Sequence, residues 1–171
     1  MPNAARNREA LLPITHDAFH ALVDVTKSLL RPMNLSSVLD QILTQVEDLF
    51  GYKVCSVVLP TGRKDQLYLA AHRGYDPAIA NTIRIKIGEE GIIGHVAATG
   101  KPYYAPDVAV DPYYIAGSSH VRSQYSVPLI IDEKIIGVLD VESHELAAFP
   151  KEVQLVIEAF AALAALAIYR A

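Results

Sequence analysis

Cysteine, tryptophan and long hydrophobic runs are scarce or missing in this chain of 171 residues. Its one cysteine, Cys55, excludes an internal disulfide and any zinc or iron–sulfur site built from several cysteines. The longest apolar run, 159–169, spans eleven residues, whereas a membrane-spanning helix needs about 20. We therefore expect no membrane span and no export signal. Because a single cysteine fits a reducing compartment, we also expect a cytoplasmic location.

The chain also lacks a strong excess of charge. Fifteen Lys and Arg residues stand against nineteen Asp and Glu residues, which gives a formal net charge of −4. A mildly acidic balance argues against a large nucleic-acid-binding surface, so we expect no nucleic-acid partner. With 51% hydrophobic residues the chain is too apolar to be disordered, and its length suits a single folded core.

Apolar residues at helical spacing mark both ends of the chain. After a polar tail at 1–13, which we interpret as flexible, one apolar stripe runs from Ile14 to Leu29. A second helix is predicted over 35–50, and a last helix begins near Pro150, where proline is favoured as a first helical residue.

Between these helices the pattern changes to alternating, β-branched residues joined by short turns. A short helix is predicted over 92–99, while 77–87 combines a helix start with the alternation of a strand. Tight turns between strands, with helices at the two ends, predict an α+β fold around an antiparallel sheet. The predicted strands cover 52–59, 67–72, 103–105, 124–131 and 134–142.

Three segments resemble the GAF domain family. Gly91–Pro102 (GIIGHVAATGKP) is similar to the G-x-x-G-x-V-x-x-T-G-x-P segment of that family, and the D-V and D-P pairs at 107–108 and 111–112 resemble the residues that follow it. The hairpin with VPL at 127–129 and IGVLD at 136–140 resembles the next part. The resemblance covers roughly residues 35–170.

This resemblance implies a GAF-like central antiparallel sheet of about six strands. It places the N- and C-terminal helices on one face and a ligand pocket on the other. We therefore divide the chain into a flexible tail with an N-terminal helix for association, 1–33, and a GAF domain, 34–171.

The resemblance also implies a sensory or regulatory module of bacterial signal-transduction proteins that binds a small molecule. The motifs of the cyclic-nucleotide and bilin subclasses do not match, and a haem would need an axial ligand such as His95 or His120. Free methionine sulfoxide reductases share the fold but need more than one cysteine for their disulfide chemistry. We therefore expect no enzyme and no catalytic residues, and the cofactor stays unknown. The alternatives are a dimerisation scaffold without ligand and a reductase-like enzyme that uses an external thiol.

The stretch 103–125 combines aromatic rings with hydrogen-bonding groups, which is the chemistry of a pocket wall. The alternative is structural: the rings pack the loop on the sheet, and Asp107 and Asp111 cap turns. No second His or carboxylate stands at ligand spacing from His120, so no metal site is predicted. We predict ligand binding by Tyr104, Asp107, Tyr113, Tyr114, His120, Arg122 and Tyr125.

Cys55 lies within a predicted strand and shares a face with Val57 and Leu59. We therefore expect a buried thiol that packs as a small apolar group rather than a reactive one.

The last helix has two apolar stripes, and a helix that is apolar on two sides must be covered twice. The second stripe steps by 4, 3, 4 and 3 through Leu155, Ala159, Ala162, Leu166 and Tyr169. We predict a homodimer, parallel or antiparallel, through the helices Ile14–Leu29 and Val153–Tyr169. The alternative is that the first helix packs on the last within one chain. In the predicted mechanism a ligand orders the loop, and the helices pass the shift to an output domain or partner.

Overall fold

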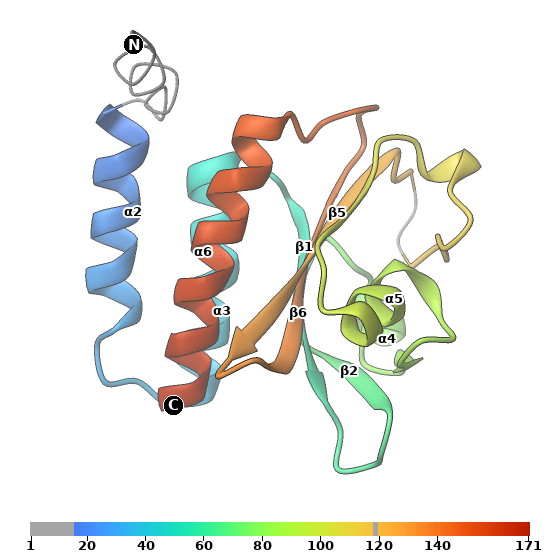
Figure 1. Ribbon diagram of the computed structural model, residues 1–171, viewed down its shortest axis with the longest axis horizontal. Coiled ribbons are helices and arrows are strands. Elements are labelled where there is room, and N and C mark those ends of the chain that lie inside the picture. Colours follow the sequence, from blue (N-terminus) through green and yellow to red (C-terminus); the bar gives the residue numbers. More distant parts are fainter. Residues whose placement is uncertain (1–15, 118–119) are drawn as a thin grey trace, which may run out of the picture.

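The computed structural model describes residues 16–117 and 120–171; the tail 1–13 and Ile14 lie outside this range. Figure 1 shows the long helices on one side of a central sheet and smaller elements on the other. In chain order the elements are α2 (His16–Leu29), α3 (Leu35–Phe50), β1 (Val54–Pro60), β2 (Gln66–Arg73), α4 (Pro77–Ala80), β3 (Arg84–Lys86), α5 (Gly91–Thr99), β4 (Tyr103–Ala105), the 3-10 helix η1 (Val108–Val110), β5 (Ser123–Ile131), β6 (Lys134–Ser143) and α6 (Lys151–Arg170).

Six strands form one sheet in the order β3-β2-β1-β6-β5-β4. Every paired neighbour runs antiparallel. The β5–β6 hairpin therefore lies inside the sheet, and β6 pairs with β1 on its other edge. This architecture confirms the predicted α+β fold with about six antiparallel strands.

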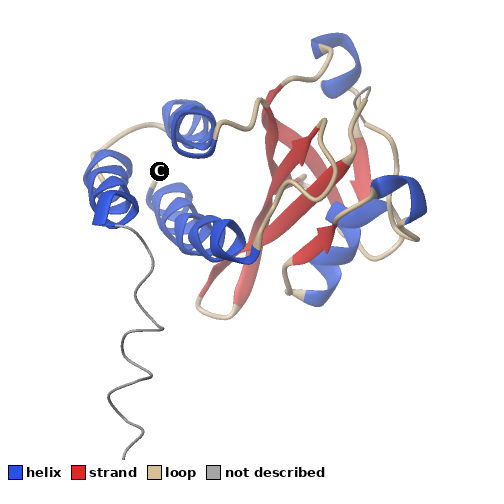
Figure 2. Cartoon of the chain, turned by 90° about the horizontal axis from the view of Figure 1, so that it is seen from above, coloured by secondary structure: helices blue, strands red, loops and turns tan. Residues whose placement is uncertain are grey.

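The helix-covered face holds the larger part of the core. Helices α3 and α6 pack on the sheet, and α2 packs on these two helices as an outer layer (Figures 1 and 2). Val25 and Leu29 of α2 are buried in this layer, so part of the first predicted stripe is covered within the chain. Strands β1, β5 and β6 contribute odd-numbered side chains here, among them Val57, Tyr125 and Leu139.

Local signals fix the ends of α3 as the sequence predicts. The Asn34 side chain accepts a hydrogen bond from the Ser37 backbone N–H at 2.9 Å, which caps the first turn. Gly51 ends the helix with a φ of 73°, in the left-handed region where glycine has no Cβ penalty.

Helix α6 is long and apolar enough to cross a membrane by length and composition alone. Packing accounts for one side of this helix, because Ile157, Phe160 and Ala164 are fully buried against the sheet and the neighbouring helices. A core helix passes the same test, so we assign α6 to the core.

The opposite face of the sheet carries a second, smaller core beneath α4, α5 and residues 105–117. Ile92, Val96 and Ala97 of α5 pack here against Val58 and Val138 of the sheet. Gly94 allows the close approach of α5 to β3, since a Cβ at this position would lie 2.8 Å from the Lys86 carbonyl oxygen. This face of the sheet therefore carries the small helices and the cavity that α5 borders.

Candidate functional site

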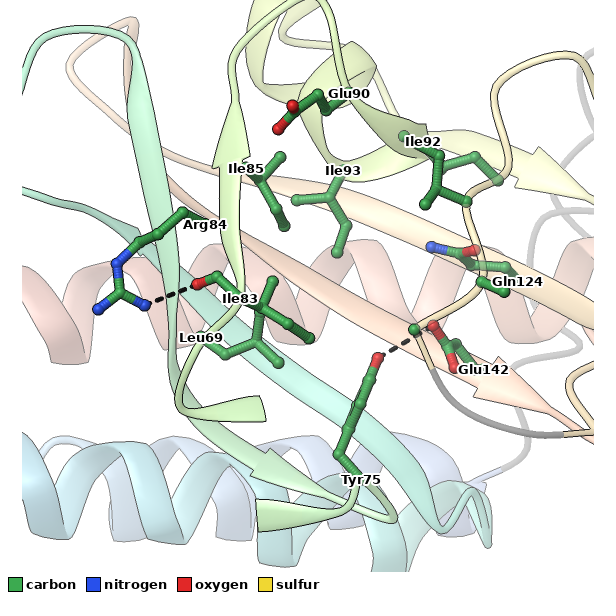
Figure 3. A pocket seen from close by; sticks show the side chains of 14 residues that line it. Leu69, Tyr75, Ile83, Arg84, Ile85, Glu90, Ile92, Ile93, Gln124 and Glu142 are labelled. Carbon is green, nitrogen blue, oxygen red and sulfur yellow. Dashed lines mark hydrogen bonds between the residues drawn. The ribbon is translucent and has the colours of Figure 1, made fainter. Parts of the chain in front are cut away.

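A cavity of about 300 Å³ lies between α5, the β2–β3 edge and the open face of the sheet (Figure 3). Its walls are mostly apolar, and isoleucine side chains from β3, α5 and the segment 115–117 supply most of them. The lining residues are Leu69, Tyr75, Ile83, Arg84, Ile85, Glu90, Gly91, Ile92, Ile93, Ile115, Ala116, Gly117, Gln124 and Glu142.

Polar groups gather on the sheet side of the cavity. Gln124 on β5 and Glu142 on β6 are register partners, and both are buried. The Tyr75 hydroxyl donates to Glu142 Oε1 at 2.9 Å, as Figure 3 shows. The Arg84 guanidinium donates instead to the Asn81 and Ile83 carbonyl oxygens and turns away from the other lining side chains. The floor of the cavity is therefore rich in hydrogen-bond acceptors.

Asp140 lies behind this floor, two residues before Glu142 on β6. Its Oδ1 accepts hydrogen bonds from Gln124 Nε2 at 2.7 Å and from the Ser126 hydroxyl. These bonds hold the Gln124 side chain in place. Asp140 Oδ2 and the Ser56 hydroxyl, which are on register partners of β6 and β1, have no hydrogen-bond partner within the described part of the chain.

Strand alternation brings these groups to one face. Successive side chains on a strand point to opposite faces of the sheet, so Asp140 and Glu142 share the cavity side while Leu139 and Val141 join the helix-side core. A D-x-E pair inside an apolar strand thus puts two carboxylates side by side in the interior.

Burial shifts the protonation of this cluster. Removal from water raises the pKa of Asp140, although the hydrogen bonds from Ser126 and Gln124 act in the opposite direction. The pKa of Tyr75 is also raised, first by burial and then by the nearby carboxylates of Asp140 and Glu142. Burial, assisted by the same two carboxylates, raises the pKa of Tyr114 to about 12. The floor of the cavity is therefore acidic and shielded from solvent.

Two of the predicted ligand-binding tyrosines lie on the helix-covered face. Tyr104 packs edge-on against Tyr125 and Phe149, with ring centroids 6.1 and 6.0 Å apart. The Tyr125 hydroxyl donates to Glu158 of α6. Both rings lie on the far side of the sheet from the cavity.

The other five predicted residues lie between β4 and β5. Asp107 caps η1 by accepting from the Ala109 N–H at 3.0 Å, which is the structural alternative considered for it. Tyr113 stacks on His95 with ring centroids 4.0 Å apart. Tyr114 is half-buried, and His120 and Arg122 are exposed.

The predicted stretch reaches the cavity through other residues. Among the described residues that line it, Ile115, Ala116, Gly117 and Gln124 belong to the 103–125 stretch, and none of the seven predicted ligand-binding residues lines the cavity. Ligand contact by those seven residues stays a prediction.

Sequence reasoning missed Tyr75, Gln124, Asp140 and Glu142. Asp140 ends the IGVLD segment that resembles the family, and this resemblance does not indicate a buried carboxyl. Two acidic residues at alternate positions of an otherwise apolar strand were the available signal, because such carboxylates share a face and must find partners there. Tyr75 gave no such signal, since only the tertiary structure brings it to β6.

Cys55 is buried on the helix-covered side, as predicted. Burial raises its pKa to about 12, so the thiolate that acts as a nucleophile is scarce near neutral pH. The thiol is therefore on the opposite face of the sheet from the cavity.

The family comparison matches this architecture. The GAF domain family model matches residues 32–168, so the chain belongs to the GAF domain family. It is similar to GAF domain-containing protein A of Dictyostelium discoideum, with 40% identity over 86 residues, which are 50% of this chain and 51% of that protein. The match thus spans about half the length of this curated relative. Membership of this family supports a general assignment of the chain as a signalling or sensory module.

Solved structures agree on the fold and correct one prediction. The GAF domain of an Acinetobacter phosphoenolpyruvate-protein phosphotransferase is 21% identical, with a TM-score of 0.79 and coverage of 91% of this chain and 94% of that one. The free methionine-R-sulfoxide reductase of Neisseria meningitidis, solved with its substrate, is 28% identical, with a TM-score of 0.79 and coverage of 90% and 89%. The prediction that the chain is not an enzyme is wrong on this finding, because an enzyme family shares its fold. The count of cysteines that supported that prediction excludes a dithiol within the chain, not an enzyme that uses an outside thiol.

Proposed function

We propose that the chain is a GAF sensory module whose cavity binds a small molecule that has an amino group and a short apolar body. One observation carries this proposal: Glu142 and Gln124 form an acceptor-rich floor under isoleucine walls, with the buried Asp140 carboxyl directly behind. A positively charged N–H donor would find carboxylate and carbonyl oxygens there, and its apolar part would displace water from the isoleucines.

Volume and charge restrict the class of ligand. About 300 Å³ is at the small end of ligand pockets, which suits an amino-acid-sized molecule rather than a tetrapyrrole. A phosphate has no ammonium group to pair with Glu142 and Asp140, so we expect the cavity to disfavour phosphates. We infer that free amino acids and their derivatives are the ligand class.

The 103–125 stretch completes the proposed site. Ile115–Gly117 already line the cavity, and Tyr114 lies close enough to the two carboxylates for them to raise its pKa. We propose that a ligand draws the segment 113–117 inward, so that Tyr113 and Tyr114 border the bound molecule.

Isothermal titration calorimetry with a panel of free amino acids, including methionine sulfoxide, tests this function. Glu142→Gln keeps the shape of the floor and removes its charge, so we expect it to weaken binding of an amino-bearing ligand at least tenfold. Glu145→Gln, at an exposed position, is the matched control and should bind as the wild type does. Equal affinity of Glu142→Gln and the wild type would contradict the proposal.

The second candidate function is reduction of a free methionine sulfoxide, favoured by the 28% identity and matching fold of the Neisseria enzyme. In this reaction two thiols give their hydrogens to the sulfoxide oxygen, releasing the thioether and water while the thiols join as a disulfide. Cys55 is the one thiol of the chain and lies across the sheet from the cavity. An external dithiol must therefore supply both electrons.

Turnover of methionine sulfoxide with dithiothreitol as the reductant tests this candidate. We expect Cys55→Ala to retain the wild-type rate and Glu142→Gln to lose it. If the protein does not accelerate the thiol-dependent reaction, binding alone remains as the proposed function. If Cys55→Ala loses turnover, the assignment of an external dithiol is contradicted.

We further propose a homodimer through the terminal helices, with 1–33 serving association and 34–171 serving sensing in a cytoplasmic signalling protein. The predicted second stripe of α6 supports this, because all five of its residues are exposed in the single chain. Leu155 is 49% exposed and Tyr169 is 65% exposed. The 4-3-4-3 spacing is typical of helices that pair as coiled coils. An output domain or partner would read the resulting helix arrangement.

A further inference from the structure

The first turn of α2 brings two imidazole nitrogens together at the edge of the molecule. His16 and His20 stand four residues apart, so they lie one above the other on the same helix face. Their Nε2 atoms are 3.1 Å apart and their ring centroids 4.3 Å apart. Both side chains are exposed, and α2 is the outer helix of the fold (Figure 1).

We propose that His16 and His20 form a two-ligand binding site for a divalent transition metal such as Zn²⁺ or Ni²⁺. Zinc–nitrogen bonds are about 2.0–2.1 Å long, so two nitrogens on one ion lie about 2.9 Å apart at a right angle and about 3.3 Å apart at the tetrahedral angle. The observed separation of 3.1 Å falls between these values. The helix therefore holds the two donors at chelating distance before any ion arrives.

The donor set defines the class of metal. Neutral imidazole is a ligand for zinc, nickel and copper, whereas magnesium and calcium require oxygen ligands. Asp24 lies one further turn along the same face and adds negative charge, and it is exposed. No group of three or more metal-binding side chains occurs within residues 16–117 and 120–171, so the described part of the chain offers two histidine ligands to this ion.

A simple hydrogen bond between the two rings is the competing explanation, since 3.1 Å also suits an N–H···N contact. The two explanations differ in one respect. A chelate requires both Nε2 atoms to be unprotonated and to bind the same ion, while the hydrogen bond requires one of them to keep its proton.

Calorimetric titration of ZnCl₂ into the full chain without a histidine tag tests the site. We expect one ion per chain, and a loss of affinity of at least about tenfold in His16→Ala and in His20→Ala, because each leaves a single ligand. His144→Ala, which removes an exposed histidine elsewhere, should bind as the wild type does. MgCl₂ should give no heat of binding.

Imidazole NMR signals provide a second readout. Addition of ZnCl₂ should shift the Nε2 resonances of His16 and His20 together and leave that of His144 in place. The proposal is overturned if His16→Ala binds zinc as tightly as the wild type, or if His144→Ala weakens binding as much. Circular dichroism confirms that each variant keeps its helices, and alanine at an exposed helix position favours the helix.

Discussion

At the residue scale, Asp140 combines an expected cost to stability with the role in binding that we propose. Its carboxyl is fully buried, and burial raises its pKa. Ser126 and Gln124 satisfy Oδ1, while Oδ2 has no partner in the described part of the protein. A buried carboxyl with an unpartnered oxygen costs free energy of folding, and we propose that Asp140 offsets this cost by its role at the binding site.

We predict that Asp140→Asn is more stable than the wild type at pH 7. The folded-state pKa is raised, so between the ordinary value near 3.9 and the folded value the native state holds a proton that the unfolded state releases. Stability of the wild type therefore falls as pH rises through this window, and asparagine removes that loss. We expect a gain of about 1–3 kcal/mol at pH 7 and a much smaller difference below the ordinary pKa.

Urea unfolding at pH 3.5 and pH 7 measures this change in the free energy of unfolding. In a thermal melt, each kcal/mol corresponds to about 2–4 °C in Tm. Asp132→Asn, at an exposed turn position, should leave both values unchanged. A variant Asp140→Asn that is less stable than the wild type at pH 7 would show that the carboxylate stabilises the fold. Weaker ligand binding should accompany the gain.

Gly94 controls how closely α5 approaches β3. A Cβ would lie 2.8 Å from the Lys86 carbonyl oxygen, which is backbone and cannot rotate away. We predict that Gly94→Ala lowers the free energy of unfolding by about 1–2 kcal/mol, even after the gain in helix propensity. Gly62→Ala has no atom within 4 Å of its Cβ and should be close to neutral in the same urea titration. If both variants unfold alike, the contact is not limiting.

At the scale of elements, β5 joins the cavity to the helix layer. Gln124 and Ser126 face the cavity side, whereas Tyr125 between them faces α6 and donates its hydroxyl to Glu158. Burial and the bond to Glu158 both raise the pKa of Tyr125. A displacement of β5 by a ligand would therefore pull directly on the last helix.

A double-mutant cycle measures this link. We predict a coupling energy of about 0.5–3 kcal/mol between Tyr125→Phe and Glu158→Gln, because the first removes the hydrogen bond and the second removes the acceptor charge that strengthens it. A matched cycle of Tyr104→Phe with Glu158→Gln should give a value near zero, since Tyr104 contacts the Tyr125 ring rather than the carboxylate. Additive effects in the first cycle would remove this path from the proposed transmission.

Most elements could be predicted from the sequence because their signals are local. Asn34 and Gly51 mark the ends of α3, and the alternation in 124–131 and 134–142 marks the central hairpin. The cavity could not be predicted in the same way. Glu142, Tyr75 and Ile92 are far apart in the chain and meet only through sheet register and the placement of α5. The composition of 103–125 predicts rings such as Tyr125 for a pocket wall. Composition does not show which face of the sheet a residue takes, and Tyr125 lies on the helix-covered face.

At the scale of the whole molecule, one exposed stripe on α6 argues for association. Covering α6 by the sheet and by α2 leaves Leu155 and Leu166 in contact with water, at 49% and 37% exposure. We predict that the wild type has a mass of twice 18.7 kDa in size-exclusion chromatography with light scattering, and that the double variant Leu155→Glu with Leu166→Glu has 18.7 kDa. Charges within the paired stripe would repel and resist burial.

Leu146→Glu supplies the control, because Leu146 is also exposed but lies in the loop before α6. It should keep the dimer mass. A wild type that elutes as a monomer at micromolar concentration would contradict the homodimer, while the ligand and metal proposals would stand, since neither needs a second copy.

The sequence by itself determined the element order, the α+β class and the family, because periodicity, caps and short motifs are properties of neighbouring residues. It also determined that one thiol is present, and that the second stripe of α6 is apolar. Only the tertiary structure decided which stripe stays exposed, which side of the sheet holds Cys55, and which side chains meet at the cavity. These are outcomes of strand register and helix packing, which join residues distant in the chain and therefore leave little trace in any one segment.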